Sequence, residues 1–436
     1  MLFVSPPFLA VITLVALSAS GIITFNPRID VPRRLLILDA VVYWVLAAIL
    51  SALLFHARAA VAFVRLNAAK IAGTLVSLAL SLIIAEYGAR IVVARTRGFS
   101  LVPSPTLHHT SPPNLSLRDN TGSFVRTNAD GLRSGWTRES FRTQHDRIAV
   151  IGDSFTFGLG VNDDETTPYF LEQLLRERLG RDDVGVLNAG TISWSPLIER
   201  NAFRDVVRDY HPTVTVLLLD VTDIGDDYKY AQDIVPESDP DDPRFVTDTV
   251  EPEPLFALLK LTGPIVDVLR TPRAVLDTLR GETADTDPWR HFRLEIDGVV
   301  ETNRWFVLRY PLDKTRPYFE KTLSYARDIA RDVRAADSEI LVVVPPRYFQ
   351  WNDRECPNDW NLRQRTRNEP YEHEYFKFFD EAAKKEAFPI ISLLPAFQAT
   401  DRFPLVLDHD AHWNKEGNRF VAETLADLLL ERGLVR

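Results

Sequence analysis

The sequence holds one cysteine, Cys356, among 436 residues. A single cysteine excludes both an intrachain disulfide and a cysteine cluster for zinc. The chain also has no Gly-Lys-Ser/Thr ending and no G-x-G-x-x-G spacing after its predicted strands, so a nucleotide-binding loop has little support. The acidic stretch 237–253 lacks the ligand spacing of an EF-hand, which favours a solvated loop over a calcium site.

A basic excess is missing as well. Lys and Arg total 50 against 60 Asp and Glu, which gives a formal net charge of −10. The acidic excess falls mostly in the C-terminal part of the chain. A nucleic-acid partner is therefore not expected there, since such proteins present a basic patch or stripe.

Long apolar runs are confined to the first hundred residues. Phe8–Phe25, Leu35–Phe55 and Ile71–Val93 are each about long enough to cross a hydrocarbon core as a helix. We predict a membrane domain at 1–97 with three transmembrane helices; three buried helices of a soluble domain are the alternative. The first run lacks a basic n-region and an A-x-A-like exit, which argues against a signal peptide. The two connecting loops carry equal positive charge, so the positive-inside rule does not orient the spans.

Residues 98–126 are rich in Pro, Ser and Thr and include His108 and His109. We predict an exposed linker here. The two histidines could contact a metal, but no carboxylate cluster is nearby, and a solvated linker is favoured. The remaining domain, 127–436, contains an acidic, Pro-rich insertion at about 232–310, which we interpret as a cover over one end of a sheet.

From residue 147 onward, short apolar runs alternate with helical patterns, which predicts a parallel sheet with helices on both faces. The predicted strands are Ile148–Ile151, Val184–Leu187, Thr213–Leu219, Ile340–Val344 and Pro389–Leu393. The predicted helices are Tyr169–Leu179, Leu197–Tyr210, Tyr318–Ala336, Tyr375–Lys385 and Gly417–Glu431.

The first of these strands ends in Gly152-Asp153-Ser154. Open α/β sheets place their chemistry at the carboxyl ends of strands. A following helix directs backbone N–H groups toward that point and favours developing negative charge. Ser154 is therefore a candidate nucleophile, although a solvated serine in a strand-to-helix turn explains this stretch about as well.

A serine nucleophile requires a base. Of the nine histidines, His409 and His412 follow the last predicted strand and precede the last helix, so they belong to the same end of the sheet as Ser154. Asp410 or Asp408 could orient such a histidine and stabilise its charged form. A polar loop at a helix start is the alternative interpretation of this segment.

Taken together, three blocks resemble the SGNH (GDSL-type) hydrolase superfamily over roughly 128–432. They are Gly152-Asp153-Ser154, Asn188-Ala189-Gly190 and Asp410-Ala411-His412-Trp413-Asn414. The runs Thr127–Arg133 and Gly152–Gly158 look like those of membrane-anchored bacterial members that act on envelope glycans. The resemblance implies a flavodoxin-like three-layer α/β/α domain with neither metal nor organic cofactor.

The same resemblance implies Ser154 as nucleophile, His412 as general base and Asp410 as its carboxylate, with Asp408 as a second candidate. Many members place this acid three residues before the histidine, a position that is His409 here. The oxyanion hole would use the backbone N–H groups of Ser154 and Gly190.

The third donor of the family is an asparagine side chain after the third strand, where this chain has Thr222. Losing such a donor costs about 3–4 kcal/mol of transition-state stabilisation. Asn188 or a residue of the insertion is a possible substitute for it.

The leading hypothesis is a membrane-anchored serine esterase or O-acyltransferase that acts on an acylated envelope glycan or lipid. Hydrolase and transferase share one mechanism up to the acyl-enzyme, so the sequence does not separate them. We expect the bacterial inner membrane, with the C-terminal domain outside the cytoplasm. The alternatives are a non-catalytic glycan-binding or assembly subunit, which Thr222 favours, and a lipase or thioesterase that faces the cytoplasm.

Overall fold

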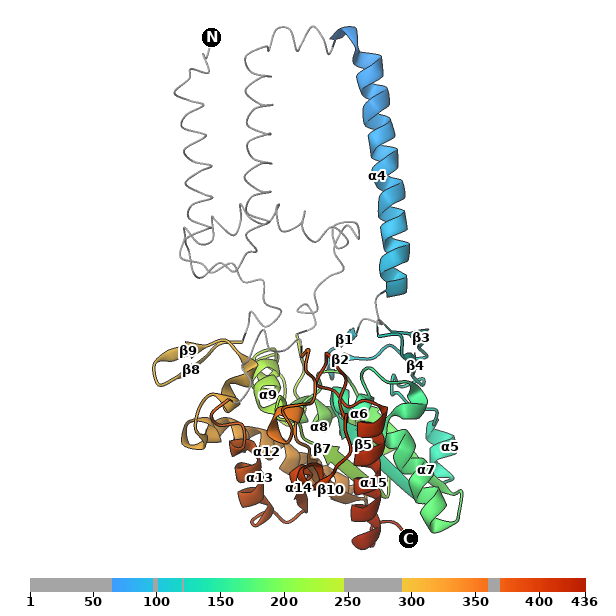
Figure 1. Ribbon diagram of the computed structural model, residues 1–436. Coiled ribbons are helices and arrows are strands. Elements are labelled where there is room, and N and C mark those ends of the chain that lie inside the picture. The colour runs from blue at the N-terminus through green and yellow to red at the C-terminus, as the bar shows by residue number, and fades with distance from the viewer. Residues whose placement is uncertain (1–64, 97–100, 120, 247–291, 360–368) are drawn as a thin grey trace. The chain divides into compact units, whose positions relative to one another are not determined.

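The computed structural model describes residues 65–96, 101–119, 121–246, 292–359 and 369–436. The chain divides into two compact units, and the described part of the first is helix α4 (Ala68–Thr96) (Figure 1). α4 covers the third predicted span, whereas the first two predicted spans lie outside the described residues. None of the helices in the described ranges is both long and apolar enough to cross a membrane.

The second unit is built on a five-stranded sheet in the order β11-β10-β7-β5-β6. All four neighbouring pairs are parallel. Numbered along the chain, this order is the 2-1-3-4-5 arrangement of flavodoxin-like folds. The predicted parallel α/β sheet is therefore confirmed. The strands are β5 (Asp146–Gly152), β6 (Val184–Gly190), β7 (Val214–Leu218), β10 (Glu339–Val344) and β11 (Ile390–Ser392).

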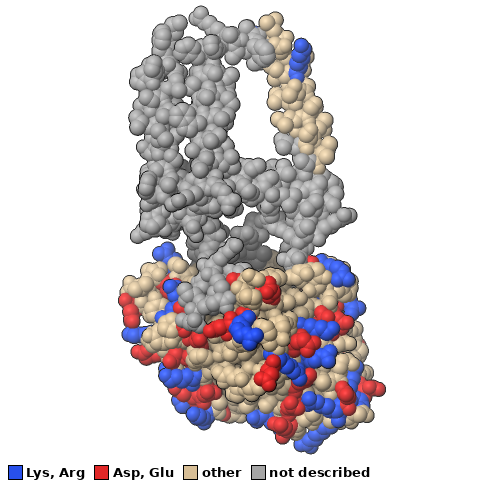
Figure 2. Space-filling view, viewed as in Figure 1, with Lys and Arg blue, Asp and Glu red and all other residues tan. Residues whose placement is uncertain are grey.

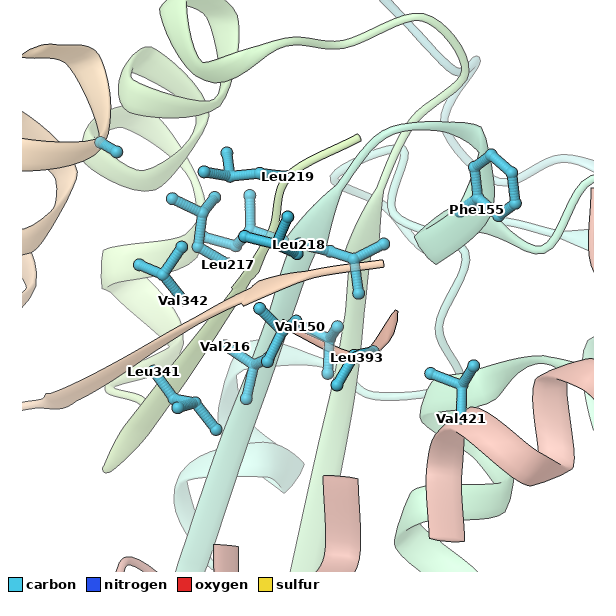
Figure 3. Close-up of a cluster of buried hydrophobic side chains, with 14 of the residues drawn as sticks. Val150, Phe155, Val216, Leu217, Leu218, Leu219, Leu341, Val342, Leu393 and Val421 are labelled. Carbon is cyan, nitrogen blue, oxygen red and sulfur yellow. The ribbon is translucent and has the colours of Figure 1, made fainter. Parts of the chain in front are cut away.

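The central strands are apolar along their length because helices cover both faces of the sheet. Val150, Val216 and Val342 are fully buried on three adjacent strands, and Figure 3 shows them in one cluster of hydrophobic side chains. Phe155 lies just beyond the end of β5 and is also buried. Burial of these side chains fixes the positions of the strand ends, and therefore the positions of the residues that follow the strands.

The helices form two groups. α7 (Thr167–Leu179) packs with α15 (Lys415–Glu431), while α12 (Leu312–Ala335) packs with both α8 (Pro196–Asp205) and α13 (Glu374–Ala383). Parallel crossovers are right-handed, so the reversal of strand order at β5 places the two groups on opposite faces. The second unit therefore has three layers.

Shorter elements complete this unit. The remaining strands are β1 (Val102–Ser104), β2 (His108–Thr110), β3 (Ser116–Arg118), β4 (Phe124–Arg126), β8 (Leu294–Ile296) and β9 (Val299–Glu301). The remaining helices are α5 (Arg138–Arg142), α6 (Ser154–Phe157), α9 (Asp223–Ala231) and α14 (Leu394–Ala399). The 3₁₀ turns are η1 (Asp163–Glu165), η2 (Val207–Tyr210), η3 (Arg304–Leu308) and η4 (Tyr348–Gln350).

The segment predicted to be an exposed linker is partly folded onto this unit. β1 and β2 pair as a hairpin, and His108 and His109 on β2 are both buried. His108 Nε2 lies 3.2 Å from Asp233 Oδ2, and His109 Nε2 lies 2.9 Å from the Ile192 carbonyl oxygen. Sequence composition suggested exposure, but the contacts that bury the two rings come from residues more than eighty positions away.

Most of the predicted insertion, 247–291, lies outside the described residues. Its described flanks form an isolated bridge between Ile234 and Phe245 and the β8–β9 hairpin. Lys and Arg are interspersed with Asp and Glu over the face of this unit that Figure 2 shows. No basic stripe is visible on that face.

Candidate active site

The nucleophile candidate lies where the strand order reverses. The chain passes from β5 to β6 on one side and returns to β7 on the other, which opens a crevice at the carboxyl end of β5. Ser154 is the first residue of α6 and follows directly on β5. Asp153 caps α6, because its Oδ1 accepts a hydrogen bond from Phe155 N at 2.8 Å. The short helix leaves the Ser154 N–H without a partner inside the helix.

A second loop brings a histidine to this serine. His412 Nε2 lies 2.7 Å from Ser154 Oγ, although 258 positions separate the two residues. The other ring nitrogen, Nδ1, contacts Asp410 Oδ1, which also accepts the backbone N–H of His412 at 3.1 Å. Ser154 and His412 are both buried. This is the Ser-His-Asp order of contacts that activates a serine hydroxyl.

The histidine loop is held at both ends. Leu407 N donates to the His412 carbonyl oxygen at 2.9 Å, and Asn414 caps α15 by accepting from Gly417 N at 2.9 Å. The Phe155 ring lies 4.7 Å from the His412 ring, centroid to centroid. The imidazole is therefore fixed by the loop on one side and by Phe155, the residue after Ser154, on the other.

The two other polar residues of this loop lie elsewhere. Asp408 is exposed, and its Oδ2 accepts from Asn358 Nδ2 at 2.8 Å. His409 is exposed as well. The structure thus brings Asp410 to the imidazole, and Asp408, the second candidate for that role, contacts a different loop.

Two glycines allow α6 to lie against the strand ends. Gly152 and Gly190 are register partners at the ends of β5 and β6. A Cβ at Gly190 would lie 2.5 Å from Phe157 N, and one at Gly152 would lie 2.3 Å from Thr156 Oγ1. A side chain at either position would displace the helix that carries the serine.

The backbone N–H of Gly190 has an internal acceptor. It donates to Asn188 Oδ1 at 3.1 Å, and Asn188 Nδ2 in turn donates to the Phe157 carbonyl oxygen at 3.4 Å. Asn188 therefore faces α6 and does not extend as an additional donor. For Gly190 to serve as an oxyanion donor, its N–H must exchange the Asn188 oxygen for the oxyanion of the substrate.

Thr222 does not have the role expected for it, that of a side-chain donor to the oxyanion. Its hydroxyl donates to Asp220 Oδ2 at 2.5 Å, and its backbone N–H donates to the same oxygen at 3.0 Å. The single proton of the hydroxyl is thus committed to a buried carboxylate. Thr222 closes a turn after β7 and does not offer a donor to a substrate.

Arg347, which sequence reasoning missed, occupies this side of the site. It follows β10, and its Nε and Nη2 donate to Asp220 at 2.9 and 2.6 Å. The guanidinium carbon lies 4.7 Å from the centroid of the Phe155 ring and 5.1 Å from that of Trp305. Burial acts to raise the pKa of Asp220. The charge and hydrogen bonds of Arg347 outweigh burial and keep this pKa below its ordinary value.

Several carboxyl groups are buried around the turn that holds Ser154. Burial raises the pKa of Asp153 to about 6; Asp220 contributes to this rise, and Arg347 and His412 oppose it. Burial, followed by the charge of Asp153, raises the pKa of Glu199 well above its ordinary value. Both carboxylate oxygens of Glu199 are buried without a hydrogen-bond partner among the described residues. Glu199 therefore favours its protonated, uncharged state.

The described ranges contain no group of three or more His, Cys, Asp and Glu side chains arranged to hold a metal ion. All the groups placed around Ser154 above are side chains and backbone groups of the chain itself. The arrangement suits proton transfer from a hydroxyl to an imidazole and the stabilisation of negative charge beside a buried guanidinium.

Comparison with known proteins gives structural likenesses only. No protein-family model and no curated protein matches the sequence. The psychrotrophic esterase EstA from Pseudoalteromonas sp. is 12% identical, with a TM-score of 0.33 over 65% of this chain and 96% of the esterase. A catalytic mutant of Axe2, an acetylxylan esterase from Geobacillus stearothermophilus, is 12% identical, with a TM-score of 0.34 over 67% of this chain and 97% of the esterase. A GDSL-like lipase from Bacteroides thetaiotaomicron VPI-5482 is 10% identical, with a TM-score of 0.32 over 69% of this chain and 92% of the lipase. Likenesses at this level carry no functional argument.

Proposed function

We propose that the chain is a serine esterase or O-acyltransferase of the SGNH type. The observation that supports this most directly is the 2.7 Å contact between Ser154 Oγ and His412 Nε2, with Asp410 on the opposite ring nitrogen. A serine that only contributes polarity to a binding surface needs neither a buried imidazole nor a carboxylate behind it. This triad is formed by two loops at the same end of the sheet.

In this mechanism Ser154 Oγ attacks an ester carbonyl carbon while its proton passes to His412 Nε2. The carbonyl π electrons move to oxygen and form an oxyanion. The intermediate then collapses: the bond to the alcohol oxygen breaks, and that oxygen takes the proton from His412. Water, or the hydroxyl of a sugar, gives its proton to His412 and releases the acyl group from the serine by the same steps. Asp410 stabilises the imidazolium that exists between these steps.

The substrate class we propose is an acylated glycan or lipid of the cell envelope, with the N-terminal region as a membrane anchor. The apolar runs at 8–25, 35–55 and 71–93 support an anchor. In the described part of α4, large apolar side chains such as Leu75, Val76 and Ile83 are exposed. A phosphatase reporter fused after Arg436 tests the proposed orientation, because it is active only if the C-terminus lies outside the cytoplasm.

The activity is tested by labelling the full chain with a fluorophosphonate probe, which reacts only with an activated serine. Wild type should label, whereas Ser154→Ala and His412→Ala should not. Thermal unfolding of the three proteins shows whether the variants are folded. Absence of labelling in folded wild type would contradict the proposal and favour a glycan-binding or assembly subunit.

A further inference from the structure

The side of the site formed by β7 and β10 lacks the donor expected of it. Thr222 occupies the position of a side-chain donor, but its hydroxyl proton goes to Asp220. Removing a single oxyanion donor costs about 10²–10³ in kcat, so a working enzyme needs a replacement. The replacement must lie at the carboxyl end of the sheet, close to Ser154.

Arg347 lies at this place and has one amino group that is not used in its contacts with Asp220 and Thr222. Its Nε and Nη2 form one edge of the guanidinium and bind Asp220, and Nη2 also lies 3.3 Å from Thr222 Oγ1. The remaining amino group, Nη1, has no hydrogen-bond partner within the described residues. It is also not among the fully buried side-chain atoms that lack a partner, so it keeps some accessible surface. A guanidinium offers five N–H donors, and the two on Nη1 are left over.

The position of Arg347 relative to the nucleophile follows from its contacts. Its guanidinium lies against one side of Phe155, the residue after Ser154, and the ring of His412 lies 4.7 Å from the same phenyl ring. The charges of Arg347 and His412 both act on the carboxyl group of Asp153, the residue before Ser154. Arg347 and His412 therefore border the same three-residue turn.

We propose that Arg347 is a further catalytic residue, whose Nη1 donates a hydrogen bond to the oxyanion formed when Ser154 attacks the substrate. This inference rests on the proposed function. Asp220 holds the guanidinium by its other edge, and the Phe155 and Trp305 rings fix its plane. A charged donor in a buried site stabilises an oxyanion more strongly than the neutral amide or hydroxyl it replaces.

The test compares p-nitrophenyl acetate with its thiono analogue on the full chain. Sulfur accepts hydrogen bonds weakly, so a thiono ester gains little from an oxyanion donor. Wild type should therefore prefer the oxo ester strongly. Arg347→Lys should lower kcat for the oxo ester about 10²-fold or more and change the thiono rate little, so that the oxo-to-thiono ratio falls by the same factor.

Arg200→Lys is the matched control. The Arg200 side chain is 4% exposed, as is that of Arg347, and it is paired with Asp328 of α12. This variant should lose stability without changing the ratio. If thermal unfolding shows that Arg347→Lys is not folded, the double variant Asp220→Asn/Arg347→Gln removes both buried charges together and is judged by the same ratio.

The outcomes separate the two proposals. A folded Arg347 variant with the wild-type ratio overturns the role of Arg347 and leaves the esterase intact. A rise in KM with unchanged kcat and ratio also overturns it, since the guanidinium would then bind the ground state of the substrate. Wild type that neither labels with fluorophosphonate nor hydrolyses the oxo ester overturns the proposed function, and the Arg347 proposal with it.

Discussion

The two sides of Ser154 are built in different ways. On the base side, Asp410 and His412 are two positions apart on one loop. On the arginine side, defined as Asp220 and Arg347, the partners are 127 positions apart and come from loops after different strands. The base side carries a motif that can be recognised in the sequence, whereas the arginine side exists only once β7 and β10 pair. The proposed catalytic site therefore combines one local motif with one contact created by the sheet.

The largest effect should come from breaking the base side. Asp410→Asn should lower kcat/KM for p-nitrophenyl acetate by about 10⁴-fold, because an amide at this position favours the wrong tautomer of the imidazole. Asp408→Asn is the matched control, since Asp408 is exposed and contacts Asn358 instead. It should change kcat/KM less than about twofold, since a surface substitution of this kind has little effect. The opposite ranking would show that Asp408 orients the histidine.

On the arginine side, loss of Asp220 should lower mainly the stability of the fold. Asp220→Asn leaves the buried guanidinium of Arg347 without a carboxylate, and breaking a buried pair costs about 3–5 kcal/mol of unfolding free energy. Urea unfolding followed by fluorescence measures this loss. Asp328→Asn removes the partner of Arg200, but Asp328 is 25% exposed and water can replace it. Equal losses in the two variants would mean that burial of the Asp220 pair adds nothing.

This difference explains which parts of the molecule the sequence predicts. The parallel sheet follows from the apolar runs, and its five predicted strands agree with the structure to within a few residues. Ser154 and His412 could be proposed together because both follow predicted strands. Arg347 could not, since nothing near it in the sequence indicates that its partner is Asp220. The burial of His109 was missed for the same reason: its acceptor, the Ile192 carbonyl, is distant in the chain.

A third variant examines the buried carboxyl group of Glu199, on which the charge of Asp153 acts. Burial raises the pKa of Glu199 well above its ordinary value of 4.5, so the folded protein holds this proton while the unfolded chain releases it. This group therefore reduces the stability of wild type as the pH rises above 4.5.

Glu199→Gln removes this loss. The free energy of unfolding of the variant should therefore rise relative to that of wild type, by at most about 1.4 kcal/mol per pH unit above 4.5. Urea unfolding at pH 5, 6 and 7 measures the gap. Glu177→Gln, on the exposed surface of α7, is the control and should leave the pH dependence unchanged. A gap between Glu199→Gln and wild type that does not grow with pH would contradict a protonated Glu199.

The smallest effect should appear at His109, which belongs to neither the base side nor the arginine side. Burial, with the neighbouring His108, lowers its pKa from 6.5 to about 3. Below pH 6.5 the unfolded chain binds a proton at His109, whereas the folded protein does not. This group therefore reduces stability as the pH falls from 6.5 toward 3. The direction is opposite to that of Glu199, because burial penalises the charged form in both cases and the charged form of histidine is the protonated one.

His109→Gln should therefore weaken the loss of stability between pH 6.5 and 4.5. At pH 7.5 it should cost about 1 kcal/mol, through the hydrogen bond to the Ile192 carbonyl oxygen. Urea unfolding across this range measures both effects, and His145→Gln, at a side chain that is 65% exposed, is the control. An acid slope that is the same in His109→Gln and wild type would show that His109 takes up a proton in the folded state. Activity per folded molecule should stay the same in both variants, in contrast to the loss proposed for His412 variants.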